Sequence, residues 1–291
     1  MAIQKEKGSV SIDAQNIMPV IKKWLYSDKD IFLREAVSNA CDAITKFRML
    51  HPDSEEEMAV TVSVDKEKKT IRISDTGIGM TADEVRKYIN QVAFSGAAEF
   101  MKQFEDKKPE EQGDIIGHFG LGFYSVFMVS NKVEIETLSS EGEAEAVHWV
   151  SKDGMDFELS AGKRASHGTD IILHIAADEK EFLETWRVRE VLNRYCGYMA
   201  YEVMLEDANA KPVEKEVPVG DEKNEDGSPK TEKVLEIPKP QQINDTAPLW
   251  LKKPADCTDE EYKDFYRKVL MDFEEPLSWI HLNVDYPFNL K

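Results

Sequence analysis

The sequence predicts an α+β fold, with helices packed on one side of a mainly antiparallel sheet. Three observations favour it. A helical segment at about 27–50 is followed by two alternating segments around a turn at 65–69. Four more alternating segments, separated by turns that contain glycine, run between 132 and 175, and a second helical segment covers 179–200. Strands joined by such short turns pair antiparallel, because a parallel connection needs a longer crossover.

The first helix is predicted to begin at residues 27–30 and to end near residue 50. Its apolar side chains recur at helical spacing, so one side faces the core. Glu35, Asn39 and Asp42, spaced i, i+4 and i+7, share the opposite stripe. Taken alone, a polar stripe of this kind is most often only the solvated face of an amphipathic helix.

An acidic loop with two glycines, Asp75-Thr-Gly-Ile-Gly-Met80, follows the strands predicted at 57–64 and 70–74. Thr81 and Glu84 come next with the spacing of a capping box, in which a hydroxyl and a carboxylate satisfy free amides at a helix start. The predicted order is therefore strand, acidic loop and helix.

This loop has two functional interpretations. Its glycine spacing matches the dinucleotide fingerprint, but that fingerprint brings a pyrophosphate to the helix start, where the carboxylate of Asp75 would repel it. A carboxylate accepts hydrogen bonds, so we favour recognition of an adenine amino group by Asp75. Gly77 and Gly79 would let the backbone approach the base. For the hexapeptide alone, an ordinary glycine-rich turn is an equally good explanation.

A second glycine-rich loop, Gly117-His-Phe-Gly120-Leu-Gly122, precedes the apolar run 123–129. A helix start after such a loop offers free amides to a phosphate chain. The sequence has no GxxxxGK[ST] motif, so charge neutralisation would fall to Mg²⁺ held through an oxygen ligand such as Asn39. The pair Gly168-Thr169 adds a hydroxyl at the head of a strand, although alone it indicates no more than a turn.

The four alternating segments of the second half predict strands at 132–138, 146–150, 156–159 and 169–175. The helix after the acidic loop is predicted to end near residue 90. Polar residues and a proline interrupt 91–113, which we interpret as a mobile connection. The apolar stripe of 179–200 is predicted to face the core.

Residues 207–242 are mixed in charge and rich in proline, with little apolar periodicity, and predict an interdomain linker without regular structure. Beyond it, Thr258 and Glu261 form a second capping box, at the start of a helix that ends near residue 273. The alternating segment 278–286 is a predicted strand without a partner, which indicates an incomplete second domain.

The composition limits the classes of function. Of the 291 residues 41% are hydrophobic and 32% charged, which suits one globular domain and a smaller piece. A formal charge of −19 argues against nucleic-acid binding. Cys41, Cys196 and Cys257 lie too far apart in the sequence for a zinc site or disulfide framework. With no apolar run long enough to cross a bilayer and no signal peptide, we expect a soluble, cytoplasmic protein without membrane contact.

Together these segments resemble the ATP-binding lineage of DNA gyrase, histidine kinases, MutL mismatch-repair proteins and heat-shock protein 90 (Hsp90) chaperones. Phe32-Leu-Arg-Glu-Ala-Val-Ser-Asn-Ala-Cys-Asp-Ala43 and Ile116-Gly-His-Phe-Gly-Leu-Gly-Phe-Tyr-Ser125 are similar to the signatures of the Hsp90 family, of the bacterial high-temperature protein G type. The resemblance implies a two-layer α/β sandwich and a stress-response chaperone ATPase. It also implies a division into an ATP-binding domain, a charged linker and the start of a middle domain, at 1–206 (with a lid at about 91–122), 207–242 and 243–291.

The resemblance implies a role for each matching residue. Glu35, with Arg34 beside it, would orient or deprotonate the attacking water, and Asn39 would hold Mg²⁺ on the phosphates. Asp75 would bind the adenine amine. Further contacts with ATP or ADP are implied for Asp42, Gly79, Met80 and Thr169 near the base, for Gly117, Gly120, Gly122 and Phe123 near the phosphates, and for Asn90.

Two features depart from the family pattern. The lid entry 88–96 is shorter than usual and carries Phe94 where the family has a basic residue, which leaves the role of Asn90 open. The chain also ends at Lys291, before a family arginine that reaches the terminal phosphate, so we expect weak turnover. The family clamps unfolded or partly folded client proteins as a homodimer, and we expect this chain by itself to be mainly monomeric.

Two other functions were considered. A histidine kinase of the same lineage needs a phosphoacceptor histidine before the first motif, and residues 1–26 contain none. A nucleotide-sensing binding module would keep Asp75 and the glycines but would not need Glu35.

Overall fold

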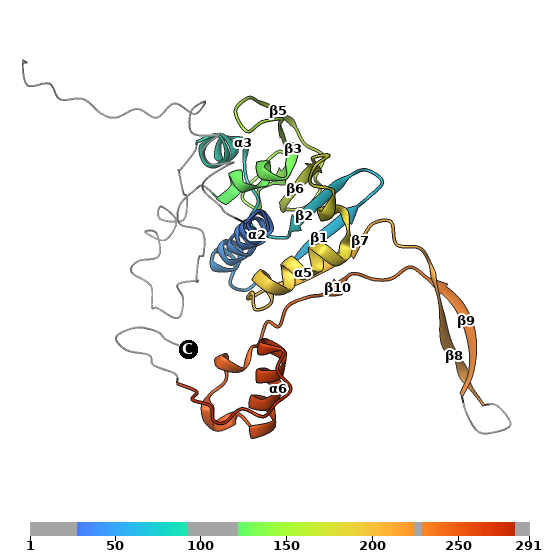
Figure 1. Cartoon of the computed structure of the whole chain (residues 1–291). Coiled ribbons are helices and arrows are strands. Elements are labelled where there is room, and N and C mark those ends of the chain that lie inside the picture. Colours follow the sequence, from blue (N-terminus) through green and yellow to red (C-terminus); the bar gives the residue numbers. More distant parts are fainter. Residues whose placement is uncertain (1–27, 92–121, 224–228, 283–291) are drawn as a thin grey trace, which may run out of the picture.

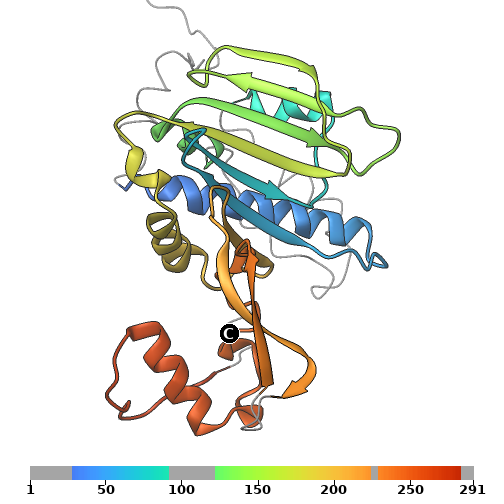
Figure 2. The ribbon, with the colours of Figure 1, turned by 90° about the vertical axis from the view of Figure 1, so that its right-hand side faces the viewer.

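The computed structural model describes residues 28–91, 122–223 and 229–282. Its main feature is an eight-stranded sheet of order β10-β7-β1-β2-β6-β3-β4-β5, with α2, α5 and η4 on one face (Figures 1 and 2). Neighbouring strands in the sheet are antiparallel except β1 and β7, which are parallel. The α+β class and the two-layer arrangement are therefore confirmed.

The elements of the sheet domain are, in chain order, α2 (Ile31–Leu50), β1 (Ala59–Asp65), β2 (Thr70–Asp75), α3 (Ala82–Glu84), η2 (Val85–Ile89), η4 (Gly122–Met128), β3 (Ser130–Leu138), β4 (Val147–Ser151), β5 (Phe157–Ala161), β6 (Gly168–Ile175), η5 (Lys180–Leu183), α5 (Thr185–Cys196) and β7 (Glu202–Asp207). They are followed by β8 (Val213–Lys223), β9 (Pro229–Glu236), β10 (Gln241–Gln242), η6 (Leu249–Leu251), η7 (Pro254–Asp256) and α6 (Asp259–Leu270).

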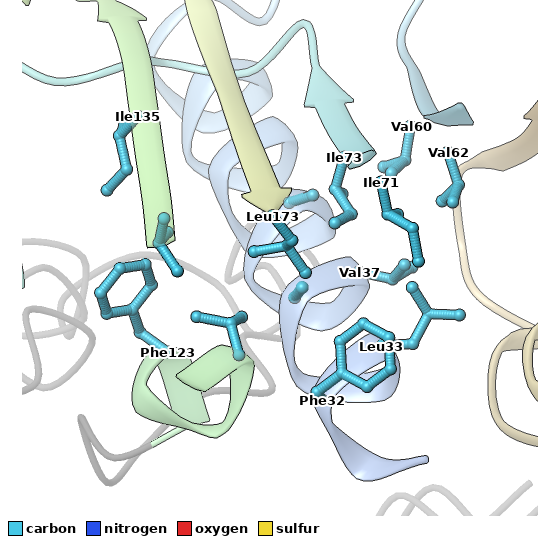
Figure 3. Packing of buried hydrophobic residues seen from close by; sticks show 14 of the residues in the cluster. Phe32, Leu33, Val37, Val60, Val62, Ile71, Ile73, Phe123, Ile135 and Leu173 are labelled. Atoms are coloured by element: carbon cyan, nitrogen blue, oxygen red, sulfur yellow. The ribbon is translucent and has the colours of Figure 1, made fainter. Parts of the chain in front are cut away.

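The core lies between α2 and the inner face of the sheet. Figure 3 shows Leu33 and Val37 of α2 directed toward Ile71 and Ile73 of β2 and Leu173 of β6, and all five side chains are almost completely buried. The apolar positions of α2 recur every three or four residues, so a single helical face supplies this contact. Burying one such aliphatic side chain contributes about 2 kcal/mol, so the helix is held mainly by this packing.

One cross-strand row on the inner face is polar at its centre. Val60, Asp75, Thr169, Thr137 and Val147 lie opposite one another on β1, β2, β6, β3 and β4. Side chains alternate between the two faces of a strand, so this row shares its face with the apolar core. The three polar members are 5%, 6% and 0% exposed. A buried polar row at the end of a hydrophobic core is costly unless its groups are hydrogen-bonded, so it marks a candidate site.

The predicted strands of the sheet are confirmed, with ends that shift by at most two residues. Both capping boxes are also present, at Thr81–Glu84 and at Thr258–Glu261. After the first box, however, a single α-turn passes into the π-helix η2. The helical run that begins at Gly122 is a 3-10 helix, and the predicted helix 179–200 divides into η5 and α5.

The segment 207–242 differs from its prediction. It contains the antiparallel ribbon β8–β9, which extends away from the sheet in Figure 1, and it ends in β10, which pairs with β7. The prediction considered only apolar burial, whereas a two-stranded ribbon satisfies its backbone groups by pairing. Sequence analysis also assigned no strand to β7, although Val203 and Leu205 alternate there and are buried.

The part of the chain after β10 packs around α6, where Trp250 contacts the rings of Tyr198 and Phe265. The helix α6 ends at Leu270, three residues before the predicted end, because Met271 adopts the left-handed conformation. Residues 278–282 form no strand, and the rest of the strand predicted at 278–286 lies outside the described residues. In the ranges that the structure describes, we find no helix of the length and apolarity that a bilayer crossing requires.

Candidate functional site

Asp75 is the last residue of β2, and its carboxyl group lies in the buried polar row. Burial raises its pKa to about 7. Hydrogen bonds from the Gly77 and Thr169 amides and the charge of Arg164 act in the opposite direction, while Asp170 raises it further. The Gly77 amide donates to Oδ1 at 2.8 Å. The site therefore holds a desolvated carboxyl group with a pKa of about 7. In its ionised form this group accepts hydrogen bonds, which suits a ligand that donates one.

The loop after Asp75 packs closely between α2 and β3. The amide of Ile78 donates to the Ala43 carbonyl at 3.0 Å, and the Ile78 carbonyl accepts from Ser140 at 2.8 Å. A Cβ at Gly77 would lie 2.5 Å from the backbone carbon of Ala43. A Cβ at Gly79, where φ is +65°, would lie 1.8 Å from the Leu138 carbonyl oxygen. Both glycines are thus required by the protein's own packing, a reason that sequence analysis did not give.

Thr137 links the loop to the polar row, and sequence analysis missed it. Its hydroxyl accepts from the Met80 amide at 3.0 Å and lies 3.1 Å from the Gly168 carbonyl, to which it donates. It is also 3.0 Å from the hydroxyl of Thr169, which must then act as donor, since Thr137 has one proton. The signal was present in the sequence, because Thr137 is a polar residue at an inward position of a predicted strand.

The polar stripe of α2 is largely shielded from solvent. Asp42 is buried, while Glu35 and Asn39 are half-buried, so the stripe is more than the solvated face of an amphipathic helix. It continues for one more turn to Lys46, which sequence analysis did not include. Burial lowers the pKa of Lys46, and the charges of Asp42 and Glu84 oppose this effect. The i+4 spacing from Asp42 would have identified it.

Glu35 lies where α2 meets the start of η4. Its Oε1 accepts from Nη2 and Nε of Arg34 at 2.5 and 3.1 Å. Its Oε2 would be only 2.2 Å from a Cβ placed on Gly122. Gly122 therefore leaves the space that this carboxylate occupies. The other glycines of the same loop, Gly117 and Gly120, lie outside the described residues.

Asn90 and Phe123 meet at Trp149. The indole Nε1 donates to Oδ1 of Asn90 at 2.9 Å, and the ring of Phe123 packs edge-on against the indole with centroids 5.8 Å apart. Phe123 is 8% exposed. Asn90 thus has a contact within the protein that sequence analysis did not foresee. It also caps the π-helix η2, a type of helix that occurs often at functional sites.

The described residues fit a magnesium ion that is carried by phosphates. In those ranges no group of three or more His, Cys, Asp or Glu side chains is arranged to hold a metal. Mg²⁺ commonly uses one or two protein oxygens together with waters and substrate phosphates. Asn39, half-buried between Glu35 and Asp42 on α2, offers such an oxygen.

Replacing Gly122 with alanine is expected to lower the rate of ATP hydrolysis about 10- to 100-fold and to leave ATP affinity within a few-fold, because the new methyl group displaces the Glu35 carboxylate. Single-turnover hydrolysis and calorimetric binding would test this. The control is Gly142→Ala, where a Cβ meets no atom within 4 Å and only the strain of its φ of +64° is added. Equal rates for the two variants would contradict the steric role of Gly122.

The fold and this site define a domain of the ATPase class that histidine kinases, gyrase and Hsp90 share. Residues 28–161 match the family model described as "Histidine kinase-, DNA gyrase B-, and HSP90-like ATPase", and residues 181–291 match the model "Hsp90 protein". The chain belongs to the Hsp90 family. This agrees with the resemblance inferred from the sequence motifs.

The similar curated proteins are bacterial chaperones of this family. The chain is 46% identical over 290 residues to the chaperone protein HtpG of Porphyromonas gingivalis, a match that covers 98% of this chain and 39% of the relative. It is 47% identical over 288 residues to that of Bacteroides fragilis, with the same coverage, and 38% identical over 291 residues to that of Colwellia psychrerythraea, with 97% and 44% covered. This chain thus spans about two fifths of the length of these relatives.

Proposed function

We propose that this chain binds Mg-ATP between α2 and the inner face of the sheet and hydrolyses it, as the nucleotide-binding part of a chaperone. The observation that carries the proposal is the buried polar row of Asp75, Thr169 and Thr137 on the sheet that α2 packs against. A structural core gains nothing from a desolvated carboxyl group at this position. Membership of the Hsp90 family supports the same reading.

The base end of the nucleotide is assigned to Asp75. Its carboxylate accepts from the exocyclic amine of adenine, while Gly77 already occupies Oδ1. Thr169 donates its proton to Thr137 and so keeps lone pairs for a bridging water. Met80, half-buried beside this row, packs against the base, and Gly79 and Asp42 complete the base end.

The phosphate end is assigned to Asn39, Glu35 and the loop that ends at Gly122. Asn39 would hold Mg²⁺ through its side-chain oxygen, and the ion would supply neutralisation of the phosphate charge. Glu35 orients the attacking water and accepts its proton, while Arg34 holds one carboxylate oxygen in place. Gly117, Gly120 and the lid at 91–122 complete this end in the proposal; the structure describes only the two end residues of the lid, Gln91 and Gly122.

In the longer protein, we propose that hydrolysis drives a homodimeric clamp on unfolded or partly folded client proteins. The division into a nucleotide-binding domain at 1–206, a linker at 207–242 and the start of a middle domain at 243–291 belongs to the same proposal. A cytoplasmic location, inferred from the sequence, also stays a prediction. A nucleotide-sensing module without turnover is the second candidate, and the fixed position of Glu35 beside Gly122 argues against it.

The proposal is tested by calorimetric titration of the chain with ATP, with and without Mg²⁺. We expect saturable one-site binding that Mg²⁺ strengthens. Asn39→Ala is expected to remove most of that Mg²⁺-dependent gain, about 10-fold or more in Kd, because one oxygen ligand is lost. Asn193→Ala, on the exposed face of α5, is the control and is expected to bind as the wild type does. No binding by the wild-type chain would overturn the proposed function.

A further inference from the structure

The guanidinium group of Arg164 contacts the last residue of β2, Asp75. Arg164, in the connection before β6, is only 11% exposed at its side chain. Its Nη2 donates to the backbone carbonyl of Asp75 at 2.7 Å and to that of His167 at 3.3 Å. Its Nη1 forms an ion pair with Asp170 at 2.5 Å, and its Nε donates to the Ser166 carbonyl at 3.1 Å. One side chain thus connects the base-recognition carboxyl residue to β6.

A glycine in the backbone lets this guanidinium group approach the Asp75 carbonyl. Gly168 has a φ of +111°, and a Cβ there would lie 2.2 Å from the Asp75 carbonyl oxygen and 2.6 Å from Nη2 of Arg164. Only glycine leaves that space. Asp170 is held in turn by the hydroxyl of Ser74, 2.5 Å from its Oδ1. The ion pair is therefore fixed at both ends, and an arginine with a planar donor fork suits such a position.

The charges around Asp75 come from three elements. Arg164 and His167 lie in the connection before β6, and Arg164 lowers the Asp75 pKa. Asp170 on β6 raises it. From α2, the thiol of Cys41 interacts with both Asp42 and Asp75, although burial is the main reason that the Cys41 pKa rises to about 12. Lys46, one turn further along α2, interacts with the charges of Asp42 and Glu84.

We propose that Arg164 is a positioning residue for base recognition, which fixes the Asp75 carbonyl and keeps the Asp75 carboxylate in its ionised, hydrogen-bond-accepting form. Asp170 limits this effect, because it neutralises part of the arginine charge. The inference rests on the proposed function, in which Asp75 accepts from adenine. Arg164 itself touches neither the base nor the phosphates, and it acts through Asp75.

Arg164 and Asp170 must then shift the pH dependence of ATP binding in opposite directions. Protonation of Asp75 turns an acceptor oxygen into a donor, so ATP affinity is lost as pH falls through the Asp75 pKa, which is about 7. Arg164→Gln removes a favourable charge and is expected to move the midpoint of this loss upward by about one pH unit. Asp170→Asn removes an unfavourable charge and keeps a side chain of similar shape, and it is expected to move the midpoint downward. A role in structure alone would weaken binding in both variants without opposite shifts.

The experiment is calorimetric titration of Mg-ATP from pH 6 to 9 into the wild type, Arg164→Gln, Arg164→Lys and Asp170→Asn. Titration of the nucleotide's own phosphate is common to all four and cancels in the comparison. We expect the midpoint of Arg164→Lys to lie close to that of the wild type, because the charge is kept. Midpoints for Arg164→Gln and Asp170→Asn that coincide, or that move in the same direction, would overturn the proposal.

A second measurement does not depend on nucleotide. The carbon-13 resonance of the Asp75 carboxyl group, assigned by its loss in Asp75→Asn, is followed against pH in the nucleotide-free protein. We expect the midpoint of this titration to move upward in Arg164→Gln and downward in Asp170→Asn. Midpoints that stay at the wild-type value would overturn the proposal. If the wild type shows the expected carboxyl titration but binds no ATP, the proposed function fails and the electrostatic role of Arg164 stands. If Arg164→Gln does not fold, the lysine variant and Asp170→Asn decide the result.

Discussion

Replacing Asp75 with asparagine abolishes ATP binding, by our expectation, and at the same time stabilises the nucleotide-free protein at neutral pH. The loss of binding, at least 100-fold in Kd, follows because the amide group reverses part of the hydrogen-bonding pattern in a buried site. The gain in stability follows because the asparagine side chain carries no charge that must be desolvated, while its oxygen still accepts from Gly77.

The sign of the stability change depends on pH. The pKa of Asp75 rises from 3.8 to about 7 on folding, so the folded state binds this proton more tightly than the unfolded state. Above about pH 7 the Asp75 carboxyl group is ionised in both the folded and the unfolded state. The full destabilisation by its buried charge is then present, on the order of 4 kcal/mol. As the pH falls from about 7 to 3.8, this destabilisation of the folded state disappears. The stability advantage of Asp75→Asn is therefore largest at pH 8 and small at pH 4.

Calorimetry at pH 8 tests the binding half of this prediction, and urea unfolding at pH 8, 6 and 4 tests the stability half. The matched control is Asp156→Asn, at an exposed aspartate before β5, which is expected to change neither quantity. Unchanged ATP affinity in Asp75→Asn would refute base recognition by Asp75. An advantage in stability that grows toward low pH would refute the assigned direction of its pKa shift.

Replacing Glu35 with alanine is expected to keep ATP binding and to reduce hydrolysis at least 100-fold. General-base catalysis and the orientation of water together contribute on this scale. Affinity is expected to stay the same or to increase slightly, because Arg34 loses its carboxylate partner and remains a cation near the phosphates. Glu35→Gln separates the two roles, since it keeps the shape of the side chain and cannot accept the proton.

Single-turnover rates and equilibrium binding, measured on the same preparations, test this prediction. Glu158→Ala, at an exposed position of β5, is the control and is expected to hydrolyse ATP as the wild type does. A Glu35→Ala variant with wild-type turnover would favour the rival function, a nucleotide-sensing module in which Glu35 has no catalytic part. Loss of both binding and turnover would instead indicate that the α2 stripe holds the nucleotide through Glu35 itself.

Local signals in the sequence were sufficient for most elements. The alternation in β2, β3, β4 and β6 and the two capping boxes depend on residues close together in the chain, so they were predictable. The parallel strand β7 and the short strand β10 were not predicted, because a partner far away in the sequence stabilises each of them. The ribbon β8–β9 was missed for a different reason, since its stability comes from backbone pairing more than from an apolar pattern.

The sequence by itself determined that Asp75, the glycine loops and the α2 stripe belong to one nucleotide-binding lineage, because short motifs carry that information. Only the tertiary structure decided how they meet. It put Asp75, Thr169 and Thr137 in one buried row, placed Glu35 against Gly122, and brought Arg164 behind Asp75. The physical reason is that strand register and the close approach of backbones fix these contacts between residues far apart in the chain, and no local pattern encodes them.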